Sequence, residues 1–279
     1  MSQYILSLSC PDRGGIVRAI STLLADNEMN IIESQQFGDS ETGRFFMRIG
    51  FEGPCDMATL ETLMQPAAVA FDMDWQIFDA AHRPRVLILL SKFDHCLIDL
   101  IYRQQVGSLK MDIVAVASNH EVGRNWAEAS GLDYHLLGGR EDKAANEARL
   151  NELIEAQDIE LIILARYMQI LTGDFVAAHA GRIINIHHSF LPSFKGAEPY
   201  SQAHKRGVKL VGATAHFVTA DLDEGPIIAQ GVEPVRHDMS VANFIDIGRD
   251  TERRTLARAV RAFIDRRVFL NGQKTIVFD

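Results

Sequence analysis

The chain has 279 residues, a length that predicts about two domains of ordinary size. Hydrophobic residues make up 47% and charged residues 23% of the chain, which is typical of a globular protein and excludes a disordered one. The net charge is −9 and no block of basic residues occurs, so nucleic acid is not expected as a partner. No apolar run is long enough to predict a membrane-spanning helix, so no membrane partner is expected either.

The N-terminus and the cysteines predict a cytoplasmic protein. The opening segment, MSQYILSLSC, has no basic start followed by a long apolar stretch, so we expect a strand there and not a signal peptide. The three cysteines, Cys10, Cys55 and Cys96, are widely spaced. Their spacing fits neither a disulfide framework nor a zinc site, which makes a reducing compartment the expectation.

Residues 1–83 are predicted to form an α+β domain of the ferredoxin-like type, and residues 84–279 a second domain. The first part is the more acidic one, with 5 arginines, no lysine and 12 acidic residues. Hydrophobic periodicity predicts the element order β-α-β-β-α-β. The strands are expected at Tyr4–Ser9, Asn30–Phe37, Arg44–Phe51 and Phe71–Ile77, and the helices at about Gly15–Asn27 and Asp56–Val69.

The segment SCPDRGGIV lies at the first strand-to-helix turn of this domain. Asp12 is expected to cap the helix, and the two glycines allow a sharp turn. The module resembles the ACT domain, which typically binds amino acids and pairs edge to edge with copies of itself, although Gly14 stands where its relatives usually have proline. The resemblance implies a homo-oligomer, either a dimer or a tetramer, and a candidate effector site at Asp12, Arg13, Gly14 and Gly15. The alternative is a turn that shapes the chain and binds nothing.

Residues 84–279 alternate strands with helices, which predicts a Rossmann-like, mostly parallel α/β sheet. Near-continuous apolar runs predict buried strands at Val86–Ser91, Ile113–Ser118, Ile159–Ala165 and Arg182–His187. Helices are expected at Asp94–Gln104, His120–Ser130, Glu141–Gln157 and Asp174–Ala180. Ligands of such sheets bind beyond the carboxyl ends of the strands, so the chemistry is expected there. The first strand-to-helix turn, LSKFDH, contains no glycine; a dinucleotide site is therefore not expected, and no cofactor is predicted.

Two segments carry groups suited to catalysis. In NIHHSFLP, Asn185 and His187 are two residues apart at a strand end and share one face, and Pro192 is expected to end the strand. Both side chains can donate hydrogen bonds to a developing oxyanion. In TADLDEGPII, three acidic residues form a tight loop that Gly225 and Pro226 close. A carboxylate from this loop, held close to a histidine, can keep that histidine protonated or move a proton.

Taken with the run VGATAHFV, which contains His216, these motifs resemble the formyltransferase fold of folate enzymes, of which glycinamide ribonucleotide transformylase is the best-known relative. The segments LSKFDHCLIDL, LARYMQIL, SFLPSFKGAEPY and GRDTERRTLARAV extend the resemblance over nearly the whole chain, to the formyltetrahydrofolate deformylase family. It implies hydrolysis of 10-formyltetrahydrofolate to tetrahydrofolate and formate, which supplies formate for purine synthesis and balances the one-carbon folate pool. It also implies catalytic roles for Asn185, His187 and Asp223, and a folate-binding segment formed by Met168, Gln169, Ile170 and Leu171.

The first turn departs from the transformylase pattern, in which a loop with glycine holds a phosphate through backbone N–H groups. Here Lys92 is its only cation, and Phe93 and His95 are bulky, so water is the expected acceptor. Three alternatives stay open: transfer to an amine acceptor, an amino-acid-sensing protein without activity, and a metal hydrolase. The last would draw its ligands from His187, His188, His204, His216 and Asp223. No zinc motif occurs, however, and the adjacent His187 and His188 would point to opposite faces if the strand continues through them.

Overall fold

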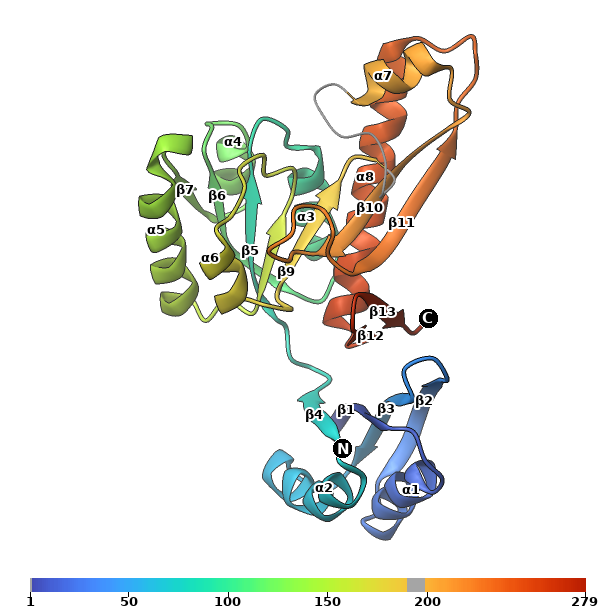
Figure 1. Ribbon diagram of the computed structural model, residues 1–279. Coiled ribbons are helices and arrows are strands. Elements are labelled where there is room, and N and C mark those ends of the chain that lie inside the picture. The colour runs from blue at the N-terminus through green and yellow to red at the C-terminus, as the bar shows by residue number, and fades with distance from the viewer. Residues whose placement is uncertain (1, 190–198) are drawn as a thin grey trace. The chain divides into compact units, whose positions relative to one another are not determined.

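The computed structural model describes residues 2–189 and 199–279 and divides the chain into two compact units (Figure 1). Unit 1 consists of Met1–His82 together with Arg266–Asn271 and Ile276–Asp279, and unit 2 of Arg83–Asp265 with Gly272–Thr275. The division expected after residue 83 did not anticipate that C-terminal residues belong with unit 1. Pro192, expected to end a strand, lies outside the described residues. No described helix is both long enough and apolar enough to cross a bilayer.

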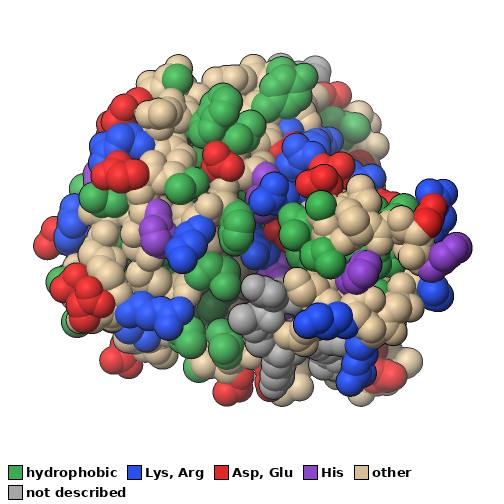
Figure 2. Space-filling view, turned by 90° about the horizontal axis from the view of Figure 1, so that it is seen from above, with side chains coloured by type: hydrophobic (Ala, Val, Ile, Leu, Met, Phe, Trp, Pro, Cys, Tyr) green, Lys and Arg blue, Asp and Glu red, His purple; other side chains and the backbone are tan. Residues whose placement is uncertain are grey.

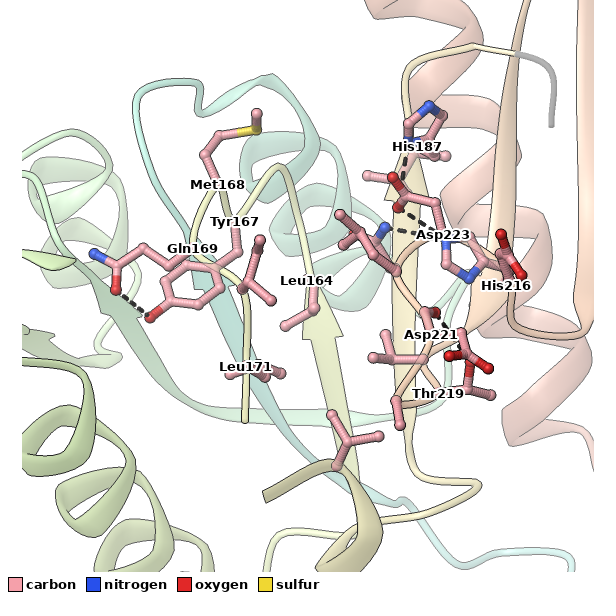
Figure 3. A pocket seen from close by; sticks show the side chains of 18 of the residues that line it. Leu164, Tyr167, Met168, Gln169, Leu171, His187, His216, Thr219, Asp221 and Asp223 are labelled. Carbon is pink, nitrogen blue, oxygen red and sulfur yellow. Dashed lines mark hydrogen bonds and ion pairs between the residues drawn. The ribbon is translucent and has the colours of Figure 1, made fainter. Parts of the chain in front are cut away.

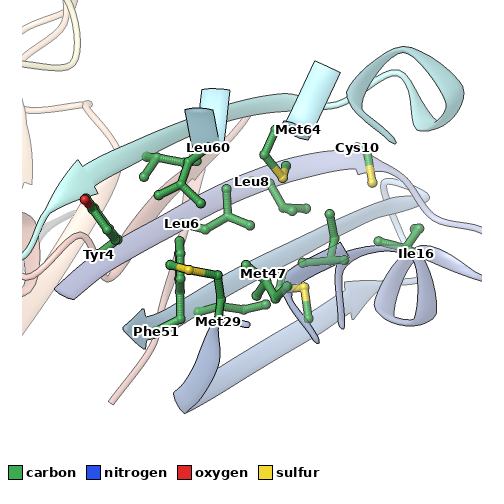
Figure 4. Close-up of a cluster of buried hydrophobic side chains, with 14 of the residues drawn as sticks. Tyr4, Leu6, Leu8, Cys10, Ile16, Met29, Met47, Phe51, Leu60 and Met64 are labelled. Atoms are coloured by element: carbon green, nitrogen blue, oxygen red, sulfur yellow. The ribbon is translucent and has the colours of Figure 1, made fainter. Parts of the chain in front are cut away.

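Unit 1 has the predicted β-α-β-β-α-β order and an antiparallel sheet in which the strands run β2-β3-β1-β4. Its elements are β1 (Ser2–Pro11), α1 (Ile16–Asp26), β2 (Asn30–Asp39), β3 (Arg44–Gly53), α2 (Met57–Phe71) and β4 (Asp74–Asp79). Alternate residues of β1 are buried, and Figure 4 shows Leu6 and Leu8 of this strand packed with Leu60 and Met64 of α2. The predicted α+β fold of this part is therefore confirmed.

The turn before α1 differs from the expectation that Asp12 caps the helix. The N-cap residue is Gly15, at a φ of +101°, and no side chain caps the helix. The Asp12 backbone N–H donates to the carbonyl oxygen of Gly43, which holds Asp12 against the hairpin. A capping side chain must sit at the N-cap itself to reach the first free N–H groups, and Asp12 is three residues too early.

The C-terminal residues of unit 1 cover part of its sheet. Phe269 packs edge-on against Phe46, with 5.8 Å between the ring centres, and Asn271 donates a hydrogen bond of 2.6 Å to the carboxylate of Asp39. Phe269 and Asn271 lie in β12 (Val268–Asn271), which pairs with β13 (Lys274–Val277). No pattern in the sequence linked this segment to residues more than 200 positions earlier, because the contact depends on tertiary packing.

Unit 2 contains a seven-stranded sheet in the order β11-β10-β9-β8-β5-β6-β7, with helices on both faces (Figure 1). The five strands β5 to β9 are parallel, and β10 and β11 are antiparallel to their neighbours. The strands are β5 (Arg85–Leu90), β6 (Asp112–Ser118), β7 (Asp133–Leu136), β8 (Leu161–Leu164), β9 (Ile183–His187), β10 (Leu210–Phe217) and β11 (Ile227–Pro234). The helices are α3 (His95–Gln105), α4 (Arg124–Ala129), the short η1 (Arg140–Asp142), α5 (Lys143–Ala156), α6 (Gly173–Ala178), α7 (Pro199–Arg206) and α8 (Val241–Ile264).

The mostly parallel sheet confirms the predicted fold class of unit 2, and the parallel strands place their carboxyl ends along one edge. Helix α4 is shorter than predicted because Gly123, at a φ of +89°, begins it. The polar strand β7 and the long helix α8 were not among the predicted elements. Helix α8 has the greatest bearing on the site, because it packs along β10 and β11 and carries the buried residue Glu252.

Candidate active site

A cavity of about 440 Å³ lies beyond the carboxyl ends of β8 and β9. Figure 2 looks onto a face of the molecule that is hollowed near its centre and bordered by hydrophobic and histidine side chains. One end of the cavity is apolar and is formed by Leu164, Leu171, Val176 and Val218. The other end is polar, and Figure 3 shows His187, His216 and Asp223 there. Arg166, Asn185 and His188 also line the cavity. The cavity therefore combines an apolar slot with a group of titratable side chains, as ligand sites usually do.

Asn185 and His187 reach this cavity from one face of β9, as their spacing predicted. In the pairing of β9 with β10, Asn185 lies opposite His216. The Asn185 amide donates a hydrogen bond of 3.1 Å to Nε2 of His216. The direction of the Asn185 side chain is thus set by a residue of the neighbouring strand.

His216 is 1% exposed, and its hydrogen bonds identify its tautomer. The Nδ1 atom donates to the carbonyl oxygen of Phe217 at 2.8 Å, so the Nε2 atom carries the lone pair that accepts from Asn185. Burial lowers the pKa of His216, which keeps the ring neutral and preserves this arrangement near neutral pH. The sequence placed His216 in an apolar run but did not indicate that it orients Asn185.

Asp223 is supplied by the loop between β10 and β11. Its Oδ1 atom lies 3.3 Å from Nδ1 of His187 and 3.8 Å from Nε2 of His216. The hydrogen bond with His187 holds the pKa of Asp223 below its ordinary value of 3.8, although burial acts in the opposite direction. Asp223 also adopts a φ of +58°, a left-handed conformation that aspartate tolerates better than most residues.

Gly225 allows this loop to lie against the end of β10. A Cβ atom at this position would be 1.7 Å from the carbonyl oxygen of Phe217, which is far inside van der Waals contact. The Phe217 N–H donates to the carbonyl oxygen of Pro226 at 2.9 Å and fixes the approach. The glycine of the LDEGP motif therefore lets the loop lie close enough to β10 for Asp223 to contact His187.

His188 lies beside His187, with the two rings stacked at 4.9 Å between centres and 23° between planes. Opposite faces were expected only if the strand continued through both residues. Strand β9 ends at His187, so that condition is not met and the alternation of a strand does not extend to His188. Burial and the nearby charge of Arg166 lower the pKa of His188 to about 4. His188 is therefore neutral near neutral pH.

Comparison with known proteins places the chain in a family. Residues 84–260 match the family model described as formyl transferase. The protein named formyltetrahydrofolate deformylase from Corynebacterium sp. is 45% identical to this chain, and the match covers 99% of this chain and 98% of that protein. The protein of the same name from Bacillus subtilis is 48% identical, and the match covers 98% of this chain and 93% of that protein. The crystal structure of formyltetrahydrofolate deformylase from Burkholderia mallei is 49% identical, with a TM-score of 0.96 over 100% of both chains. The chain belongs to the formyltetrahydrofolate deformylase family.

A more distant likeness extends beyond the deformylase family. The crystal structure of glycinamide ribonucleotide transformylase 1 from Symbiobacterium toebii is 32% identical, with a TM-score of 0.67. The match covers 72% of this chain and 97% of that one. Deformylases and a transformylase therefore share one catalytic fold, and the fold by itself does not distinguish them.

The residues predicted from the deformylase resemblance are distributed as follows. Asn185, His187 and Asp223 meet at the polar end of the cavity, and Met168, Gln169, Ile170 and Leu171 line its wall. Figure 3 shows Leu171 at the apolar end, whereas Met168 and Ile170 are exposed. The candidate effector residues Asp12, Arg13, Gly14 and Gly15 lie in unit 1, on an exposed loop where Arg13 donates to the carbonyl oxygen of Ala70.

The histidines of the metal-hydrolase alternative do not form a metal-binding group. His204 is engaged elsewhere, with its ring bonded to the carbonyl oxygen of Met239. Among the described residues, the one group with metal-ligand spacing is His95, Cys96 and Glu252. Glu252 already accepts hydrogen bonds from Arg166 and from Tyr200, and a cation there would lie beside the Arg166 guanidinium. This arrangement does not suit a metal ion.

Proposed function

We propose that this chain hydrolyses 10-formyltetrahydrofolate to tetrahydrofolate and formate. The observation that carries the proposal is the meeting of Asn185, His187 and Asp223 at the polar end of an apolar slot. Sequence identity of 45–49% over nearly the full length of proteins named formyltetrahydrofolate deformylase supports the same reaction. In the cell, the released formate would supply purine synthesis and draw on the one-carbon folate pool.

The apolar end of the cavity is the proposed pterin slot. Leu164, Leu171, Val176 and Val218 offer the flat, dry surface that an aromatic ring system requires. The backbone of residues 168–171 and of the loop that carries Asp223 would supply hydrogen bonds to the edge of the ring. A pterin in this slot directs the formyl group on the N10 nitrogen towards Asn185 and His187.

Hydrolysis begins with attack of water on the formyl carbon, which gives a tetrahedral intermediate with a negatively charged oxygen. The Asn185 amide uses one N–H for His216 and keeps the other for this oxygen. His187 contributes its Nε2 atom, which is buried and has no hydrogen-bond partner among the described residues. Because Nδ1 of His187 faces Asp223, the carboxylate stabilises the protonated ring that donates to the oxygen.

The intermediate collapses when the bond between the formyl carbon and N10 breaks. The N10 nitrogen needs one proton, and the attacking water must lose one. Asp223 and His187 together supply the path for this transfer, a role usually worth a factor of about 10² to 10⁴ in rate. The pair needs no cofactor for these steps, and none is proposed.

The reaction is tested by incubating the purified protein with 10-formyltetrahydrofolate. Formate and tetrahydrofolate should appear in equal amounts, at a rate proportional to enzyme. A protein that binds the folate but releases no formate would contradict the proposal and would favour the sensor alternative.

We also propose that unit 1 binds an amino-acid effector and mediates self-association. The sheet has β2 at one edge, and Ile32 and Phe37 of this strand are exposed, as a pairing edge would require. Formate release should respond to an amino acid linked to one-carbon supply, such as glycine or methionine. Substitution Ile32→Lys should reduce the mass measured by light scattering, and an unchanged mass together with indifference to every amino acid would contradict this proposal.

A further inference from the structure

The crevice where a doubly wound sheet usually binds its ligand is occupied by this protein's own side chains. The switch point of unit 2 lies between β5 and β8, because β5 is followed on one side by β6 and on the other by β8. Phe93 and His95 follow β5, and Arg166 follows β8. These side chains meet two others, Tyr200 of α7 and Glu252 of α8. We refer to Phe93, His95, Arg166, Tyr200 and Glu252 as the acceptor-side cluster.

Glu252 holds the acceptor-side cluster together. Its carboxylate is 1% exposed and accepts three hydrogen bonds. His95 donates to Oε2 at 2.8 Å, whereas the Tyr200 hydroxyl donates to Oε1 at 2.6 Å and Arg166 to the same oxygen at 3.3 Å. A buried carboxylate with this many donors is fixed in place, and so are the groups that donate to it.

Arg166 is the member of the cluster that faces the catalytic residues. It is 9% exposed, lines the cavity beside His188, and has its guanidinium 5.2 Å from the centre of the Phe93 ring. Its backbone adopts a φ of +66°, a conformation in which glycine is ordinary and arginine is strained. A long cationic side chain is thus retained at a position where the backbone favours the smallest residue.

Helix α8 has a glycine, Gly248, at the point where the ring of Tyr200 packs against it. A Cβ atom at Gly248 would be 2.1 Å from the Tyr200 ring, so only glycine leaves room for the ring to reach Glu252. The turn after β5, which carries Phe93 and His95, is held by a second set of contacts at Ser91. The Ser91 hydroxyl donates to Oδ1 of Asn119 at 2.7 Å and accepts from the Met168 N–H at 3.0 Å. These contacts hold the side chains of the cluster in the crevice from both sides.

We propose that the acceptor-side cluster, with Arg166 at its centre, restricts the nucleophile to water and so makes the site hydrolytic. This inference rests on the proposed function. Asn185, His187 and Asp223 can serve an amine as well as water, so the choice must be made by other residues. With the pterin in the apolar slot, the formyl group would lie at the polar end of the cavity, which His187 and Arg166 both line. An incoming amine would have to displace the cluster, and its ammonium form would be repelled by the fixed charge of Arg166.

Substitution Arg166→Gly tests the inference, because glycine suits the left-handed backbone and removes both the bulk and the charge. The probe is glycinamide, supplied with 10-formyltetrahydrofolate at mildly alkaline pH. In the transfer reaction the amine nitrogen bonds to the formyl carbon, the bond to N10 breaks, and one proton passes from the amine to N10. Mass spectrometry then gives the ratio of formylglycinamide to formate. We expect this ratio to rise by about tenfold or more over the wild type.

Arg249→Ala is the matched control. Arg249 is exposed and also lies over the Phe93 ring, at 5.8 Å, and no hydrogen bond or ion pair joins it to Glu252 among the described contacts. This variant should keep the wild-type rate and the wild-type product ratio. A similar rise in Arg249→Ala would show that any loss of positive charge near Phe93 has the effect, and would overturn the role given to Arg166.

The outcomes separate the two proposals. A wild-type protein that releases no formate contradicts the proposed function, whatever the variants do. A wild type that releases formate, with a folded Arg166→Gly variant whose product ratio is unchanged, overturns the inference alone. If Arg166→Gly does not fold, Phe93→Ala decides, because it opens the same side from solvent without removing a buried charge. An unchanged ratio in that variant would likewise overturn the inference.

Discussion

Replacing Asp223 by asparagine separates the charge of this residue from its shape. Asparagine has the same size and also tolerates the left-handed backbone, here at a φ of +58°, so the loop should keep its position. It cannot accept a proton, and it cannot stabilise a charged His187 at 3.3 Å. Loss of proton transfer is usually worth a factor of about 10² to 10⁴, or roughly 3–5 kcal/mol of transition-state stabilisation.

The assay for Asp223→Asn is formate release under saturating 10-formyltetrahydrofolate, combined with a direct measurement of folate binding. We expect kcat to fall by about 10² or more, while the dissociation constant changes by less than about tenfold. This split is expected because Asp223 acts on the proton and on His187, whereas the apolar slot holds the pterin.

Asp174→Asn is the control for Asp223→Asn, because Asp174 is an exposed carboxylate of α6 outside the cavity. It should leave kcat unchanged. A folded Asp223→Asn protein with near-normal turnover would refute the assignment of Asp223. Equal losses in binding and in kcat would instead show that the residue mainly supports the loop.

Three further predictions address the loop, the buried carboxylate and metal dependence. Gly225→Ala should lower kcat/KM by about 10², because the loop must move away from Phe217 and takes Asp223 with it; Gly173→Ala, where an added Cβ meets nothing within 4 Å, is the control. Burial alone would raise the pKa of Glu252. The hydrogen bond from His95 and the charge of Arg166 together outweigh burial, so the pKa lies below its ordinary value of 4.5. The stabilisation that Glu252 gives the folded state is therefore complete above pH 4.5 and is lost as the pH falls through the lower pKa of the folded protein. In urea titrations at neutral pH, Glu252→Gln should lower the free energy of unfolding by about 3–5 kcal/mol, and this free energy should depend less on pH in the acid range than in the wild type. Activity should survive chelation by EDTA, and stoichiometric zinc whose removal abolishes turnover would overturn the mechanism.

Local patterns were sufficient to predict most of the fold. Strands such as β5 and β8 are continuous apolar runs, and their burial follows directly from the alternation of strands with helices. The prediction failed where local and tertiary preferences diverge. Strand β7 is short and polar, so it has no recognisable pattern of its own and depends on pairing with β6. The docking of Phe269 on Phe46 joins residues too distant for any periodicity to relate.

The site was predictable in its motifs but not in the residues that orient them. Asn185, His187 and Asp223 stand in segments whose spacing and resemblance identify them. His216 and Arg166 do not, because their significance depends on which side chains lie across the strand or across the crevice. The left-handed φ of Arg166 is likewise invisible in the letters LARYMQIL, since only the structure shows that an arginine occupies a position suited to glycine.

Three histidines at the polar end of the cavity differ in what their surroundings allow. Burial lowers the pKa of both His188 and His216, to about 4 in His188, and neither ring is positioned to gain a proton near neutral pH. His187 is the one of the three whose Nδ1 atom faces the carboxylate of Asp223 at 3.3 Å. In the proposed mechanism His187 is therefore the ring that donates to the formyl oxygen, through an Nε2 atom that has no hydrogen-bond partner among the described residues. A neutral His188 suits this role, because a positive charge on a ring stacked against His187 would repel any positive charge that develops there during the reaction.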